Sequence, residues 1–157
     1  MTSLPIAQTH HPAGATRSAN ATVTLDYEAR FLRRKRLTTD DGWSFVVDLV
    51  QTTSLDHGDL LELDDGRWVE IRAAAEPVLD VTGDNLARLA WHIGNRHTPC
   101  QIYEDRLRIR KDKVIAHMLE HLGAILTEAE APFTPEGGAY GFGRTHSHEH
   151  GASAHEH

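Results

Sequence analysis

The chain has 157 residues, a formal net charge of −7 with neutral histidines, one cysteine and twelve histidines. This length suits one ordinary domain or two small ones, and two small domains would gain stability from dimerisation. The negative charge disfavours nucleic acid as the main partner, because phosphate binding relies on Lys and Arg. A single cysteine excludes an intramolecular disulfide and a CxxC motif, and no apolar run reaches the about 18 residues of a membrane helix.

Residues 1–19 are predicted to form a disordered N-terminal arm, because they are rich in small and polar types and lack periodicity. Their start lacks the basic and apolar stretches of a secretory signal, so we expect a cytoplasmic protein with no membrane partner. His10 and His11 lie in this arm. A solvated, flexible segment is the favoured interpretation of this pair, and contact with a metal is the alternative.

Residues 20–75 are predicted to form a small antiparallel β-domain. Apolar and polar residues alternate from Val23 to Tyr27, which is the period of a half-buried strand. Asp-Asp-Gly sequences at 40–42 and 64–66 are hairpin-turn signals between runs of strand character. The basic run at 33–36 is typical of a solvated strand edge that resists aggregation, and a docking surface for an acidic protein is the alternative.

Residues 76–140 change to a strand, helix, strand, strand, helix, strand pattern, which is the ferredoxin-like βαββαβ order. The fold class is therefore α+β. We expect a first helix capped by Asp84 and ending near Asn95, and a second capped by Asp112 and ended by Gly123. The apolar stripe of the second helix would be Val114, Ile115, Met118, Leu119 and Leu122. The expected strands cover 77–81, 101–103, 106–110 and 124–131, with Cys100 as a buried strand residue.

Residues 141–157 form a low-complexity tail in which histidines alternate with small or acidic residues. Neutral imidazole is a suitable ligand for Ni, Cu, Zn and Co, and a disordered tail lets several imidazoles surround one ion. The tail therefore predicts metal capture; a purification tag, normally an unbroken histidine run, or a merely solubilising tail is the alternative. The candidate tail ligands are His146, His148, His150, His155 and His157.

The expected ferredoxin-like domain contains four further histidines that are possible ligands. His97 continues the apolar side of the first helix just past its end. Spacing alone favours a structural histidine there, and one imidazole cannot hold a metal, although two copies across a dimer two-fold axis could. His92 is expected to be structural or to support a ligand. His117 and His121 form an i, i+4 pair that is expected to be a solvated face rather than a chelating pair.

Catalytic motifs are missing from the sequence, since it has no nucleophile elbow, P-loop or GxGxxG. We therefore expect a protein that is not an enzyme. An RNA-recognition domain of the same topology needs aromatic residues on its central strands, and residues 107–110 offer none.

Two segments resemble a known family. Residues 91–99, Trp-His-Ile-Gly-Asn-Arg-His-Thr-Pro, followed by Gln101, are similar to the hallmark region of UreE-type urease accessory proteins. Residues 132–140, Pro-Phe-Thr-Pro-Glu-Gly-Gly-Ala-Tyr, resemble the end of the folded part in that family, and the resemblance extends roughly from Leu25 to the C-terminus. Some members carry His-Asp-His where this chain has Lys-Asp-Lys at 111–113, so we expect that peripheral metal site to be absent.

The resemblance implies a homodimer of two-domain subunits, with a peptide-binding-like N-terminal domain and a ferredoxin-like domain that binds metal and dimerises. It implies a nickel metallochaperone that supplies urease through an accessory GTPase complex. It also implies that His97 and its copy in the second subunit bind Ni(II), with tail histidines as further ligands. Zn(II) or Cu(II) could occupy the same sites, and sequestration or storage of copper, zinc or nickel is the alternative function, because imidazoles bind Cu²⁺ more tightly than Ni²⁺.

Overall fold

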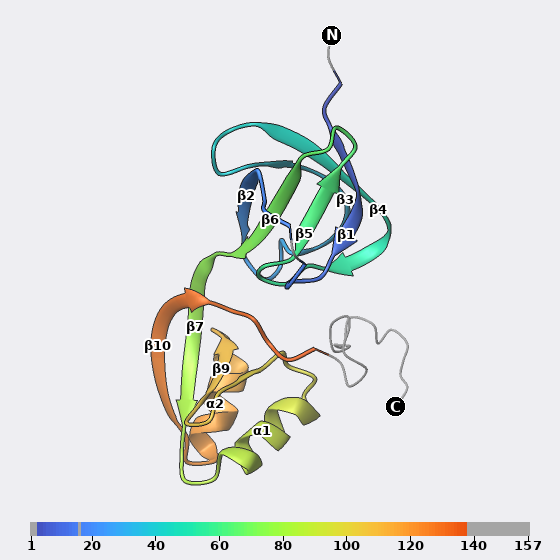
Figure 1. Ribbon diagram of the computed structural model, residues 1–157. Coiled ribbons are helices and arrows are strands. Elements are labelled where there is room, and N and C mark those ends of the chain that lie inside the picture. The colour runs from blue at the N-terminus through green and yellow to red at the C-terminus, as the bar shows by residue number, and fades with distance from the viewer. Residues whose placement is uncertain (1–2, 16, 138–157) are drawn as a thin grey trace. The chain divides into compact units, whose positions relative to one another are not determined.

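The computed structural model describes residues 3–15 and 17–137, and the chain divides into two units, Met1–Ala74 and Ala75–His157 (Figure 1). The division lies close to the change of pattern that precedes Pro77 in the sequence. None of the described helices is long and apolar enough to cross a membrane.

The first unit is a six-stranded sheet with the order β2-β6-β5-β1-β4-β3. Its strands surround a common interior in Figure 1. Buried aliphatic side chains and Phe45 form the core of this unit. In chain order the strands are β1 (Ile6–His11), β2 (Ala21–Leu25), β3 (Phe31–Thr38), β4 (Ser44–Ser54), β5 (Leu60–Leu63) and β6 (Trp68–Ala73).

Both predicted hairpins are confirmed. β3 pairs antiparallel with β4 and β5 with β6, and Gly42 and Gly66 have positive φ in the connecting turns. The sheet is nevertheless mixed rather than entirely antiparallel, because β1 pairs parallel with β4 and β2 parallel with β6. Parallel neighbours need a long connection, and local turn signals do not reveal such pairings.

The prediction of a disordered arm over residues 1–19 is wrong for β1. This strand lies between β4 and β5 in the sheet, and its histidines have partners distant in sequence. His10 Nε2 is 2.7 Å from the buried Asp59 carboxylate, and the His11 ring stacks on Trp68 at 4.6 Å between centroids. These contacts give the two histidines structural partners in place of the solvated arm that the composition favoured.

The basic run at 33–36 lies on β3, an edge strand of this sheet, and all four side chains are exposed. Arg34 forms an ion pair with Asp48 on the neighbouring strand at 3.2 Å. The expectation that this run lies on an exposed strand edge is therefore confirmed.

The second unit has the predicted ferredoxin-like order. Its antiparallel sheet runs β10-β7-β9-β8. The elements are β7 (Ala75–Thr82), α1 (Leu86–Asn95), β8 (Gln101–Ile102), β9 (Leu107–Arg110), α2 (Lys113–His121) and β10 (Ile125–Pro132).

Both helices of this unit cover the same face of the sheet. One hydrophobic cluster contains Leu79, Val81, Leu107 and Ile109 of the central strands together with buried residues of both helices. Because side chains alternate along a strand, Asp80 of β7 and Arg108 of β9 lie on the opposite face. The sheet thus has one apolar face under the helices and one face that carries charged groups.

The predicted capping residue is confirmed for α2 but is wrong for α1. Asp112 caps α2 as predicted, and its Oδ1 accepts hydrogen bonds from the amides of Val114 and Ile115. α1 is capped by Asn85 rather than Asp84, through a hydrogen bond from the Arg88 amide at 3.1 Å. Val114 is 63% exposed and does not belong to the apolar stripe.

A candidate metal site around His97

His97 lies in the turn that ends α1. Its amide donates to the Gly94 carbonyl at 2.9 Å, and the Thr98 amide donates to the Ile93 carbonyl at 3.3 Å. This pair of hydrogen bonds is the Schellman motif, in which the residue after the cap adopts the left-handed conformation. His97 has φ +57°, and it is the one non-glycine residue with positive φ in the described part of the chain.

The end of α2 shows the same motif with the expected residue. The Gly123 amide donates to the Glu120 carbonyl and the Ala124 amide to the Leu119 carbonyl, both at 3.0 Å, and Gly123 has φ +89°. Glycine adopts this conformation freely, whereas an L side chain loses about 1 kcal/mol or more there. A histidine where the other helix uses glycine is therefore an outlier that suggests a function for the imidazole.

The surroundings of His97 suit a cation. The residue is exposed at the C-terminus of α1, where the helix dipole places a partial negative charge. Trp91 in the same helix is 62% exposed, and its ring meets the His92 ring edge-on at 5.0 Å. His92 is half-buried and contacts this tryptophan, which agrees with a structural or supporting role.

The other histidine pair of the second unit lies on α2. His117 and His121 are both exposed on α2, as expected for a solvated face. The tail ligands lie outside the described residues: His146, His148, His150, His155 and His157. Within residues 3–15 and 17–137, no group of three or more His, Cys, Asp or Glu residues is placed to hold a metal ion.

Cys100 was expected to be a buried strand residue, but it is half-buried and directly precedes β8. Burial raises the pKa of its thiol to about 11, and the Glu136 carboxylate contributes in the same direction. Metals bind the thiolate, so this raised pKa makes Cys100 a poor ligand near neutral pH.

Sequence reasoning missed a polar network on the sheet face opposite the helices. Arg108 is 9% exposed and binds both carboxylate oxygens of Asp80, at 2.7 and 3.2 Å. Its Nη1 donates to the Tyr103 hydroxyl at 3.1 Å, and Gln101 Nε2 donates to the same hydroxyl at 2.7 Å. Gln101 belongs to the motif that begins at Trp91, but a local sequence pattern does not reveal partners that are distant in sequence.

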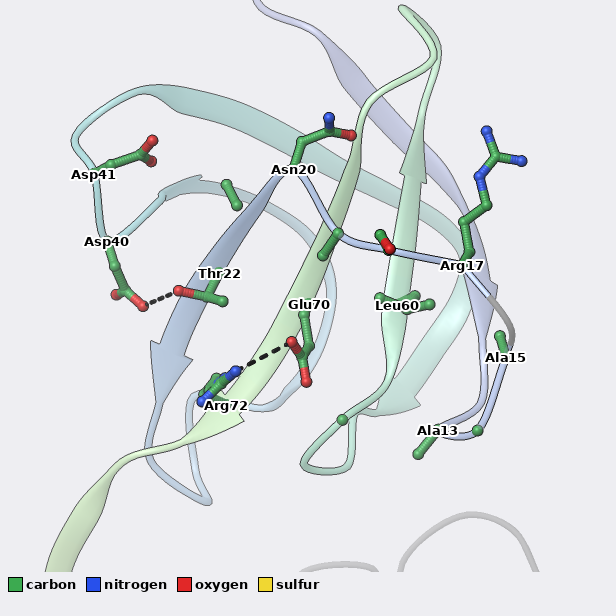
Figure 2. A pocket seen from close by; sticks show the side chains of 15 residues that line it. Ala13, Ala15, Arg17, Asn20, Thr22, Asp40, Asp41, Leu60, Glu70 and Arg72 are labelled. Atoms are coloured by element: carbon green, nitrogen blue, oxygen red, sulfur yellow. Dashed lines mark hydrogen bonds and ion pairs between the residues drawn. The ribbon is translucent and has the colours of Figure 1, made fainter.

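A separate pocket of about 840 Å³ lies in the first unit and is lined mainly by residues 13–15 and 17–22 and by the turn at 40–41 (Figure 2). Three of its charged groups have short polar contacts: Asp40 accepts hydrogen bonds from Thr22 and Thr24, and Arg72 pairs with Glu70. The Thr22 bond is the main reason that the pKa of Asp40 lies below its usual value. None of the described lining residues is a histidine or a cysteine, so this pocket is not the candidate metal site.

Two family models match the chain, and together they cover both units. The N-terminal domain of the UreE urease accessory protein matches residues 4–74, and the C-terminal domain of the same protein matches residues 76–157. The gap between the two matches coincides with the division of the structure after Ala74.

Similar proteins from several bacteria carry the name urease accessory protein UreE. The one from Ruegeria pomeroyi is 58% identical over 147 residues, which is 94% of this chain and 99% of the relative. That from Rhodobacter capsulatus is 57% identical over 89% of both chains. That from Paracoccus denitrificans is 61% identical over 80% of both.

Proposed function

Because the chain belongs to the UreE family of urease accessory proteins, which is not a family of enzymes, we propose that it is a nickel metallochaperone in urease maturation. It binds Ni(II) through His97 and tail histidines and delivers the ion for assembly of the urease active site. The observation that carries the proposal is the exposed left-handed His97 at the C-terminus of α1, where the backbone favours glycine.

One imidazole leaves most of the coordination sphere of nickel open, so further ligands complete the site. A second copy of the chain, related by a two-fold axis, supplies a second His97 imidazole. The tail histidines supply the remaining nitrogen ligands. A site built from two copies and a tail can open, which is what a carrier needs, whereas permanent structural sites use a closed ligand set within one fold.

The exposed apolar side chains of the second unit support a homodimer. Trp91 on α1 and Ile102 on β8 are 62% and 53% exposed, and α1 is the helix that ends at His97. Packing Trp91 against a second copy would remove its apolar surface from water and bring the two His97 residues together. The proposed recipients of nickel are the urease apoprotein and its accessory GTPase complex in the cytoplasm.

A calorimetric nickel titration with determination of the molecular mass tests the proposal. We expect His97→Ala to remove the tightest site, and truncation after Arg144 to remove the weaker ones while leaving one ion per dimer. His117→Ala is the matched control, because His117 is an exposed histidine of the same unit. If only the truncation changes binding, the folded part is a scaffold for a metal-binding tail, and metal storage is the better function.

A further inference from the structure

The chain segment that leads into the tail crosses the second unit from one sheet edge to the other. We call residues 133–137, which directly follow β10, the strap. β10 is one edge of the sheet and β8 is the other, with β7 and β9 between them. Figure 1 shows the chain leaving the end of β10 and passing away from that edge. The described chain ends at Gly137, so the strap decides where the tail starts.

Hydrogen bonds follow the strap across the sheet. Arg108 Nη1, on β9, donates to the Pro132 carbonyl at 3.3 Å. The Thr134 amide then donates to Gln101 Oε1, on β8, at 2.9 Å. The Glu136 amide donates to the Cys100 carbonyl at 2.9 Å. The strap thus ends beside Cys100, three positions after His97 in the sequence.

The side chains that hold the strap are themselves held in place. Arg108 is oriented by its two bonds to Asp80, and Gln101 by its bond to the Tyr103 hydroxyl. Arg106 also stacks over the Tyr103 ring at 3.8 Å. A charge-assisted, two-bond arginine pair is among the stronger polar contacts in proteins, so this network presents the Gln101 amide in one orientation.

Phe133 anchors the start of the strap. Its side chain is fully buried, although the flanking residues Pro132 and Thr134 are exposed or half-buried. Burying a phenylalanine contributes roughly 1.5–3 kcal/mol, which favours a closed strap over a free segment.

We propose that Gln101, supported by Tyr103 and Arg108, is a positioning residue that holds the strap at the β8 edge, so that the chain continues toward the histidine tail from the side of the sheet that follows the His97 turn. The inference rests on the proposed nickel function and adds a role for residues that bind no metal. A strap held at the β8 edge raises the local concentration of tail imidazoles at the His97 site. A released strap returns the start of the tail to the β10 edge, about 14 Å away at three strand spacings.

The expected size of the effect follows from linker length. His146, the first tail histidine, follows Gly137 by nine positions and the buried Phe133 by thirteen. Effective concentration falls roughly as the −3/2 power of linker length, so lengthening alone weakens tail binding about twofold. Moving the end of the strap from the β8 edge to the β10 edge weakens tail binding further. We therefore expect a total loss of about two- to fivefold in nickel affinity when the strap is released.

The experiment uses the full-length protein with Gln101→Ala, and Lys111→Ala as the matched control. Lys111 makes an exposed ion pair with Glu128 on β10 but does not hold the strap. Hydrogen exchange of the Thr134 and Glu136 amides measures strap closure directly. Nickel titration, with the ion alone as probe, measures affinity at the tightest site in the full-length chain and in the chain truncated after Arg144.

We expect Gln101→Ala to speed exchange of both amides and to weaken nickel binding two- to fivefold in the full-length chain only. Lys111→Ala should change neither. Equal weakening in both chain lengths would mean that the substitution disturbs the His97 turn itself, which overturns the proposal. Unchanged amide exchange, or faster exchange with unchanged affinity, also overturns it.

A second variant covers the case in which Gln101→Ala fails to fold. Tyr103→Phe removes the hydroxyl that accepts from Gln101 and Arg108 but keeps the ring under Arg106. It should give the same pattern, and the same results count against the proposal. The His97→Ala titration tests the proposed function separately. If the proposed function is wrong, His97→Ala leaves the tightest nickel site intact, whether or not the strap is held at the β8 edge.

Discussion

At the scale of single residues, the conformation of His97 is the most informative feature. Both helices of the second unit end in the same hydrogen-bond motif, yet only α2 uses glycine at the left-handed position. The strained backbone of His97 is compatible with the fold because histidine is among the side chains that tolerate this region better than most. The residue is thus kept where glycine would stabilise the helix end.

This conformation predicts different stabilities for two variants that both lack the imidazole. His97→Gly relieves the strain, whereas His97→Ala keeps an unfavourable Cβ at positive φ. We expect His97→Gly to exceed His97→Ala in free energy of unfolding by about 1 kcal/mol, measured by urea denaturation of the metal-free protein. Both variants should lose the tightest nickel site. Equal stabilities would show that the left-handed conformation is not maintained in solution.

Cys100 offers a second test at this scale. With a pKa of about 11 instead of 9, the fraction of thiolate near pH 8 is about 100-fold lower than for an unperturbed cysteine. Alkylation of the native protein should therefore be slower than alkylation of the urea-unfolded chain by about that factor, followed by mass spectrometry. Because folding favours the neutral thiol, ionisation of Cys100 also lowers the free energy of unfolding. The full free energy is present below pH 9 and this contribution is lost as the pH rises through about 11. Equal alkylation rates in the two states would contradict the raised pKa of the thiol.

At the scale of elements, the two helix starts make a matched pair. Asp112 accepts two amide hydrogen bonds at the start of α2, whereas Asn85 rather than Asp84 caps α1. Asp112→Ala should therefore lower the free energy of unfolding by about 1 kcal/mol, and Asp84→Ala should change it by less than about 0.5 kcal/mol. Thermal or urea unfolding measures both. A larger loss from Asp84→Ala than from Asp112→Ala would mean that the cap positions are wrong.

The strand β1 shows why elements with distant partners are hard to predict. Its segment is short, contains two histidines and has little apolar periodicity, so composition alone favours disorder. The strand is stabilised by pairing with both β4 and β5, which are far away in sequence, and by the contact of His10 with Asp59. Turn signals, by contrast, act within a few residues, and both predicted hairpins are present.

At the scale of the whole molecule, the proposed carrier combines the His97 site of the folded part with a histidine tail. The pH dependence of nickel affinity should distinguish the contributions of these two parts. Imidazole must be neutral to bind nickel, and the imidazole of an unperturbed histidine titrates at about pH 6.5. Nickel affinity should therefore fall as the pH drops from about 7.5 to 5.5, and more steeply when more imidazoles bind each ion. We expect the full-length chain to show a steeper decrease than the chain truncated after Arg144, measured by titration at several pH values. An affinity that is unchanged at pH 5.5 would exclude imidazole ligands.

The sequence by itself determined what depends on neighbouring residues: the two Asp-Asp-Gly hairpins, the βαββαβ order, the Asp112 cap and the motifs that identify the family. It also pointed to His97 and to the tail histidines as ligands, through composition and resemblance. Only the tertiary structure decided the pairing of β1, the parallel neighbours in the first sheet, the left-handed backbone of His97 and the bonds from Gln101 and Arg108 to the segment after β10. The physical reason is that periodicity, caps and turns act over a few residues, whereas these features arise from contacts between distant segments or from backbone dihedral angles that no residue pattern specifies.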